Sequence, residues 1–182
     1  VSGSGNYSGS KTGLKFLITK LNLSNSNVSI KEITPVTSVE NAKTNVKAFV
    51  GEIEISSGEY TITTEASGTD QVKVIVTANS DATNLEPNSS RTALFHLKQV
   101  MDPATWTVTG TKQTYSGKPL STTLTIQKDG KTQYLSNGTD YDVAYSNNIN
   151  KGTASITVTG KGKYTGTITG SFEIVARSLS GA

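Results

Sequence analysis

His96 is the single histidine of this 182-residue chain, and the chain contains no cysteine. A serine hydroxyl needs a neighbouring base before it becomes a nucleophile, and a zinc site needs several His or Cys ligands at defined spacing. His96 stands beside Phe95 in a run that alternates apolar and polar residues, so it is expected on the outer face of a strand if Phe95 faces inward. These residues favour a protein that is not an enzyme, with no metal site and no cofactor.

Two further patterns could bind ions. Gly3-Ser4-Gly5 and Gly160-Lys161-Gly162 resemble phosphate loops, but the residues after them predict strand and not the helix N-terminus that binds a phosphate. Asp140, Asp142 and Glu59 could be calcium ligands, yet the chain has no Asp-x-Asp-x-Asp-Gly loop. We interpret these carboxylates as solvated side chains.

Three aromatic residues are the candidates for a binding site. Trp106, Tyr115 and Tyr134 could form a platform on which sugars stack, because their rings combine a large contact area with a polar edge. The alternative for Trp106, and also for Tyr141, is a place in the core or at a corner of a small β-sandwich.

The composition restricts the elements that could position these side chains. Serine and threonine occupy 50 of the 182 positions, whereas charged residues make up 17%. Threonine is β-branched and favours strands, so this composition predicts an all-β protein and argues against a helical bundle. The formal net charge is only +3 and no basic run exceeds two residues, so no nucleic-acid partner is expected.

No pattern for membrane insertion or export is visible in the sequence. No apolar run approaches the roughly 20 residues that span a bilayer, and residues 1–5 lack the charged and apolar regions of a signal peptide. Without cysteine no disulfide can form, but many exported proteins of Gram-positive bacteria lack disulfides too. The segment is therefore expected to be excised from a longer protein, and these features leave its compartment open.

One segment of sequence occurs near both ends of the chain. Residues 1–10 match residues 158–167 at an offset of 157, with Gly, Tyr and Gly at the same places. Tyr7 coincides with Tyr164, which favours a structural role for this tyrosine, because a ligand site need not occur in every copy.

Each copy of this segment leads to a closing phenylalanine. Phe16 and Phe172 close the two clear copies, and Phe95 closes a third, degraded copy without glycines. The steps are 79 residues (16 to 95) and 77 residues (95 to 172), so the repeat has the size of a small sandwich domain. The expected organisation is a pair of closing strands at 1–19, either orphaned or capping, then one module at 20–99 and a second at 100–182.

Apolar and polar residues alternate through both modules, as half-buried antiparallel strands require. The positions expected on the inner face are Val46, Ala48, Val50, Ile53, Ile55, Tyr60, Ile62, Val72, Val74 and Val76 in the first module, and Leu120, Leu124, Ile126, Tyr141, Val143, Tyr145, Ala154, Ile156 and Val158 in the second. Threonine fills most outward positions. No helix of consequence is expected: residues 39–47 could hold one turn, and a proline interrupts 101–106.

Glycine and asparagine mark the expected turns. Asp129-Gly130 and Asn137-Gly138 tolerate the positive φ of tight hairpin turns, and residues 147–152 supply another connection. Tyr164-Thr165-Gly166 is expected to close a last hairpin, with the glycines at 160 and 162 permitting a bulge.

Longer motifs lie in the second module. They are Tyr115-Ser116-Gly117-Lys118-Pro119-Leu120, Asp129-Gly130-Lys131, Asn137-Gly138-Thr139-Asp140-Tyr141-Asp142-Val143, Tyr145-Ser146-Asn147-Asn148 and the run from Gly152 to Gly166. With these motifs the module resembles the bacterial immunoglobulin-like repeats found in tandem in large secreted and wall-attached proteins of Firmicutes. The resemblance covers 106–176 with an echo at 1–18, whereas 20–99 share only the strand phase and Phe95.

The resemblance implies two tandem immunoglobulin-like antiparallel β-sandwich domains without an active site. It implies an extracellular location at the cell wall and a role as stalk, spacer or adhesive part of a larger surface protein, with neighbouring repeats as partners. The related extensions of phage virion proteins leave a second hypothesis open, a carbohydrate- or cell-wall-binding module. Its partner would be a surface glycan or a host protein. The resemblance does not say which, because fold analogy alone does not transfer a ligand.

Surface modules of this class sometimes carry an internal isopeptide bond. Such a bond needs a lysine, an asparagine and a catalytic carboxylate buried together. Lys15 and Glu173 lie near the closing phenylalanines, but no asparagine can be assigned to them. A whole-protein mass without loss of ammonia would exclude the bond.

Overall fold

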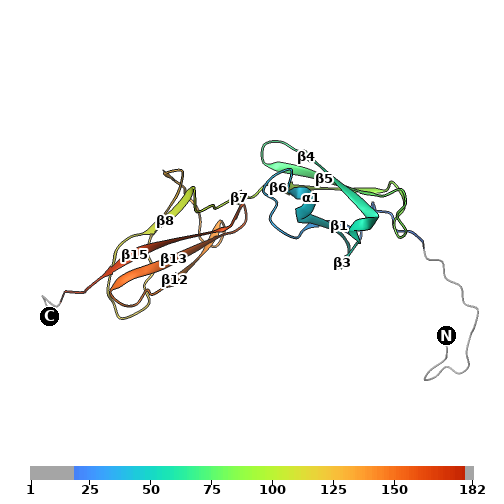
Figure 1. Cartoon of the computed structure of the whole chain (residues 1–182). Coiled ribbons are helices and arrows are strands. Elements are labelled where there is room, and N and C mark those ends of the chain that lie inside the picture. Colours follow the sequence, from blue (N-terminus) through green and yellow to red (C-terminus); the bar gives the residue numbers. More distant parts are fainter. Residues whose placement is uncertain (1–18, 179–182) are drawn as a thin grey trace, which may run out of the picture. The chain divides into compact units, whose positions relative to one another are not determined.

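The computed structural model describes residues 19–178 (Figure 1). It is mostly β, with 49% strand and one short α-helix, and its strands form several antiparallel sheets. The all-β prediction is confirmed at this level. The N-terminal copy of the repeated segment and Lys15 lie outside the described residues.

The chain divides into two compact units. The first contains Lys47–Thr63, Ile75–Thr92 and the described residues before 32, and the second contains Glu32–Val46, Thr64–Val74 and the described residues from 93 onward. The module boundaries at 19/20 and 99/100 follow the sequence repeat and stay a prediction.

Six strands precede residue 97 and form two sheets. β1 (Val28–Glu32), β2 (Val46–Val50) and β3 (Ile53–Glu54) form one sheet in this order, and β4 (Tyr60–Ala66), β5 (Gln71–Ala78) and β6 (Ser90–His96) form the other. The helix α1 (Ala42–Asn45) is a single turn within the predicted stretch 39–47, and the 3-10 turn η1 (Ser57–Glu59) precedes β4. In β5, buried and half-buried residues alternate, as the period of two predicts.

Ile53 departs from the predicted inner face. Its side chain is 76% exposed, whereas Ile55, two residues later, is buried. Ile53 pairs with Val50 across the turn at Gly51, where φ is +58°. The first residue after a tight turn lies at the hairpin end, where few neighbours can cover it.

Most strands after residue 100 belong to one seven-stranded sheet. Its path is β11 (Lys131–Thr132), β10 (Leu124–Lys128), β8 (Trp106–Gly110), β15 (Thr167–Val175), β13 (Gly152–Gly160) and β12 (Tyr141–Ser146), and β9 (Gln113–Thr114) pairs with β15. Figure 1 shows β12, β13 and β15 side by side, and these three pair antiparallel. β15 pairs in parallel with β8 and β9. A separate parallel pair consists of β7 (Gln99–Val100) and β14 (Tyr164–Thr165).

The predicted turns are present, with one difference. Asp129 and Gly130 have φ of 50° and 75°, and β10 and β11 pair directly across them, as predicted for a two-residue hairpin. Gly138 also has a positive φ of 86°, but its N–H donates to Tyr141 O at 2.7 Å, so it turns the chain into β12 instead of joining two strands of a hairpin. The last hairpin joins β13 to β15, where Gly160 donates to the carbonyl of Gly166 at 2.9 Å.

A hydrophobic core lies against the strands after residue 100. Its buried members are Met101, Trp106, Val108, Ile126, Tyr141, Ala154, Ile156, Val158, Ile168, Phe172 and Ile174. Five of the nine predicted inner-face residues of this module are among them, and the other four pack against the core half-buried. No helix among residues 19–178 is long and apolar enough to cross a membrane.

Candidate functional site

Trp106, the first residue of β8, is a core residue. Its side chain is 2% exposed, and its ring meets that of Tyr164 edge to face, with centroids 5.9 Å apart and an interplanar angle of 78°. The indole Nε1 has no hydrogen-bond partner in the described structure. A ring enclosed in this way has no face on which a sugar could stack, so the core role that the sequence left open is the one found here.

The two tyrosines of the candidate platform are accessible but separate. Tyr115 follows β9 and is 39% exposed, and its N–H donates to Val175 O at 2.9 Å. Tyr134 follows β11 and is 95% exposed. Within residues 19–178, no ring contact joins Trp106, Tyr115 and Tyr134 to one another. The structure therefore does not bring the three rings into one stacking surface.

Tyr115 borders an open hollow of about 540 Å³. Its other lining residues are Asn150, Lys151, Ala176 and Arg177. A second hollow of about 480 Å³, lined by residues 147–153, shares Asn150 and Lys151 with the first. This surface offers one aromatic ring, two cationic side chains and asparagine amides, which is a set that could bind an anionic or polyhydroxylated group.

The loop at this hollow is held by hydrogen bonds to the segment between β9 and β10. Asn148 O accepts from the N–H of Leu120 at 2.8 Å, and the Asn148 side chain donates back to Leu120 O at 2.7 Å. Asn147, with a φ of 55°, and Gly152 turn the chain at the two ends of the loop. The sequence indicated a connection at 147–152 but not that Lys151 and Arg177 lie beside Tyr115, since no local pattern links these segments.

His96 lies on the exposed side of β6, and Phe95 beside it is half-buried, as predicted. The Nδ1 atom of His96 lies 3.4 Å from Asp70 Oδ2, and its Nε2 lies 3.0 Å from Gln71 Nε2. Asp70 lies in the turn before β5 and Gln71 is the first residue of that strand. The sequence spacing alone could not identify these two partners of His96. Within residues 19–178, no hydrogen bond joins a hydroxyl group to His96.

The candidate calcium ligands are dispersed and bonded to protein groups. Asp140 accepts from the N–H of Ser136 at 2.9 Å, and Asp142 lies 3.3 Å from Lys161 Nζ. Among the residues that the structure describes, no three His, Asp or Glu side chains gather as metal ligands would. The glycines at 160 and 162 lead into strand β14, as expected for a segment that is not a phosphate loop.

Glu59 closes a loop. Its carboxylate accepts from Thr83 Oγ1 at 2.5 Å, from the Asn84 N–H at 2.9 Å and from Asn84 Nδ2 at 3.2 Å. The Thr83 hydroxyl, and after it the Asn84 N–H, hold the pKa of Glu59 below its usual value of 4.5. These bonds favour the ionised form, and they join η1 to the loop at 83–84.

This network predicts a pH dependence of stability. Because the folded pKa of Glu59 is depressed, the unfolded chain binds the proton first as the pH falls. The contribution is complete above about pH 4.5 and is lost as the pH falls through the folded pKa. We expect the melting temperature of the native chain to exceed that of Glu59→Gln at neutral pH and this difference to shrink towards pH 3.

Thermal unfolding at a series of pH values checks this expectation. Thr83→Val removes the first donor and is the matched control, so it should reduce the pH dependence assigned to Glu59. A difference between the native chain and Glu59→Gln that is equal at pH 3 and pH 7 would contradict it.

The Tyr141 phenol and the Glu173 carboxylate are the two remaining groups, and their neighbours indicate structural roles. Burial, and then the neighbouring Tyr145, raise the pKa of Tyr141, so this phenol keeps its proton at neutral pH. Glu173 is exposed and lies 3.2 Å from Lys112 Nζ, and Lys15, the lysine considered for an isopeptide bond, is outside the described residues.

Comparison with known proteins does not add to this description. No family model, curated protein or solved structure matches the chain.

Proposed function

We propose that this chain consists of tandem immunoglobulin-like repeat modules that act without enzymatic activity. Their role is that of a stalk, spacer or adhesive part in a larger extracellular protein at a bacterial cell wall. The resemblance of residues 106–176 to such repeats supports this proposal, and so do the antiparallel strands and the hydrophobic core of that segment.

The observation that carries the proposal is that the residues shared by both copies of the repeated segment have structural roles. Gly160 has no room for a side chain, because a Cβ atom there would lie 2.7 Å from the backbone nitrogen of Thr165. Gly162 and Gly166 have φ of 60° and 90°, which other residues rarely adopt. Tyr164 packs on the core through the Trp106 ring. Each of these residues has a structural reason to be there.

The N-terminal copy keeps the same residues. Gly3, Gly5, Tyr7 and Gly9 stand 157 positions before Gly160, Gly162, Tyr164 and Gly166. A repeat that retains its turn and packing residues supports a repeated structural element more than a repeated ligand site.

Binding measurements test the spacer role. We expect the whole chain to show no saturable binding to a glycan array or to purified cell wall, and Tyr115→Ala and Tyr134→Ala to behave like the native chain. Saturable binding by the native chain would contradict the spacer role.

The second candidate function is recognition of a surface glycan by the hollow beside Tyr115. One ring flanked by Lys151 and Arg177 favours an acidic polysaccharide. If binding is found, this function requires Tyr115→Ala to weaken it about tenfold. Tyr134→Ala is the matched control, since Tyr134 does not line the hollow.

A further inference from the structure

A short segment after the first closing phenylalanine pairs with a loop far along the chain. Leu21, five residues after Phe16, forms a parallel bridge with Leu85. Its N–H donates to Asn84 O at 2.8 Å, and its carbonyl accepts from the N–H of Glu86 at 2.9 Å. The chain is therefore held here by backbone bonds that need no particular side chain.

The segment after the second closing phenylalanine makes the same kind of pairing. Four and six residues after Phe95, the N–H groups of Gln99 and Met101 donate to Lys163 O at 2.9 Å and to Thr165 O at 2.7 Å. This is the parallel pair of β7 with β14. Two segments at corresponding places in the repeat thus use one mode of attachment.

A third segment of this kind follows Phe172. Ala176 and Arg177 stand four and five residues after it, and both are exposed. No strand within residues 19–178 pairs with either of them. Both residues line the open hollow that Tyr115 borders. Ala176 and Arg177 occupy the place in the repeat that Leu21 and β7 occupy in the two earlier copies. Leu21 pairs with a loop and β7 pairs with β14.

The turn that receives β7 is built for close approach. Gly166 has a φ of 90°, and a Cβ atom there would lie 3.0 Å from Met101 O and 3.5 Å from Val100 Cγ1. A side chain at this position would push the paired strand away. The spacing Gly-x-Gly-x-Tyr-x-Gly, from Gly160 to Gly166, therefore marks a turn that can accept a strand.

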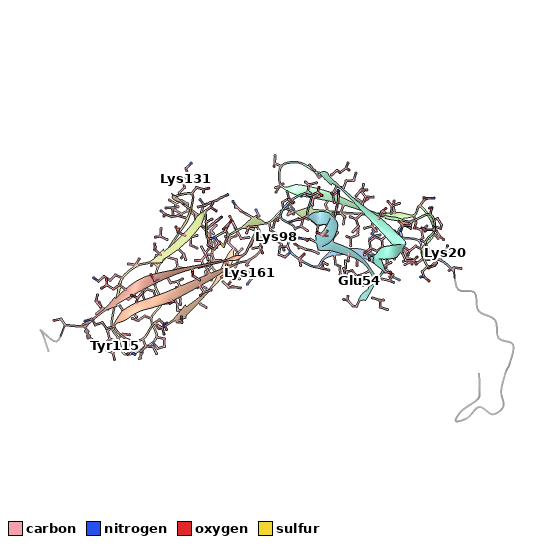
Figure 2. The ribbon with its side chains drawn as sticks, in the orientation of Figure 1. Lys20, Glu54, Lys98, Tyr115, Lys131 and Lys161 are labelled. Atoms are coloured by element: carbon pink, nitrogen blue, oxygen red, sulfur yellow. The ribbon has the colours of Figure 1, made fainter. Side chains whose placement is uncertain are left out.

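The receiving turn and the exposed segment lie apart within the same unit. Figure 2 shows Lys161, three residues before β14, and Tyr115, beside Ala176, at opposite ends of the strands that follow residue 100. A repeat that accepts a strand at one end and presents a strand at the other can be extended by further repeats.

We propose that Ala176–Arg177 is a docking strand for the Gly-x-Gly-x-Tyr-x-Gly turn of a further repeat of this kind. The occupant is a second copy of residues 102–178 joined head to tail, and it pairs in parallel as β14 does with β7. This inference rests on the proposed function, because it specifies how one stalk module takes up the next.

A lengthened chain tests the docking strand. A second copy of residues 102–178 is added directly after Ser178, which keeps the spacing that separates Phe95 from Asp102. We expect hydrogen exchange of the Ala176 amide to be at least about tenfold slower than in the original chain, since a bonded amide exchanges only when it opens. Exchange of the β13 amides in the added copy reports that it is folded.

Two results would overturn the proposal. One is an unchanged exchange rate at Ala176 while the added copy is folded. The other is slow exchange at Ala176 already in the original chain and dependent on its concentration, because the occupant would then be part of another chain, for example residues 3–9.

A pair of substitutions in the added copy locates the contact. Gly166→Ala should restore fast exchange at Ala176, because its methyl group meets the docked strand. Gly138→Ala is the matched control: Gly138 has a φ of 86°, but a Cβ atom there has no neighbour within 4 Å, so the slow exchange should persist. Equal loss of protection in both variants would contradict the assigned turn. None of these readouts involves glycan binding, so the docking strand and the spacer function can fail separately.

Discussion

Replacing Gly170 with alanine is expected to lower the free energy of unfolding of the unit that contains the seven-stranded sheet by at least about 3 kcal/mol, or to prevent its folding. Gly170 lies inside β15, opposite Ile156 of β13. A Cβ atom at this position would lie 2.8 Å from the carbonyl carbon of Val108 and closer still to its carbonyl oxygen. Because the obstacle is backbone of β8, only a shift of a central strand could relieve the clash.

Chemical denaturation followed by circular dichroism measures this loss. Gly130→Ala is the control in the same sheet: Gly130 has a φ of 75° and no atom within 4 Å of a Cβ, so alanine there should cost about 1 kcal/mol from backbone strain alone. A Gly170→Ala loss no larger than that of Gly130→Ala would show that β8 and β15 are not in close contact.

The second large effect is expected at Trp106. Trp106→Ala should cost about 3–5 kcal/mol, because it removes a large side chain from a closed core and leaves a cavity. Trp106→Phe should cost less, about 1–2 kcal/mol, since phenylalanine keeps a ring next to Tyr164 and removes an indole N–H that has no partner.

The same denaturation experiment measures both variants. Since Trp106 is the one tryptophan of the chain, its fluorescence in the native protein reports on this core, and its emission should move to longer wavelength on unfolding. Tyr134→Ala is the control, because this exposed side chain should change stability by less than about 0.5 kcal/mol. If Trp106→Ala leaves the free energy of unfolding unchanged, Trp106 is not a core residue and is again a candidate ligand-binding ring.

Local patterns were sufficient to predict strands and turns. The alternation in β5 and β13 predicted strands with a buried face, because side chains two apart point to the same side. The Asp129-Gly130 turn was predictable for an equally local reason, the positive φ that these two residues tolerate. Ile53 falls on the inner face that the alternation predicts, but it lies at a hairpin end and is exposed. The alternation alone does not show which residues pack over a side chain.

The candidate site depended on contacts that no local pattern encodes. Trp106 and Val108 share one face of β8, and only the packed structure shows that this face is enclosed by the core. Tyr115, Lys151 and Arg177 come from three separate segments and meet at one hollow. Asp70 reaches His96 from the turn between β4 and β5. The sequence could indicate each residue as polar, aromatic or exposed, but not which of them are neighbours.

The sequence by itself determined the strand class, the hairpin turn and the repeat with its glycines, since these depend on side-chain period, local φ and the order of residues. Only the tertiary structure decided that β7 pairs in parallel with β14, that β15 passes close to β8 at Gly170, and that Trp106 is enclosed. The physical reason is that backbone hydrogen bonds between strands are the same for every residue type. A period of two assigns a residue to a face, while the neighbouring strand is selected by the packing of the whole chain.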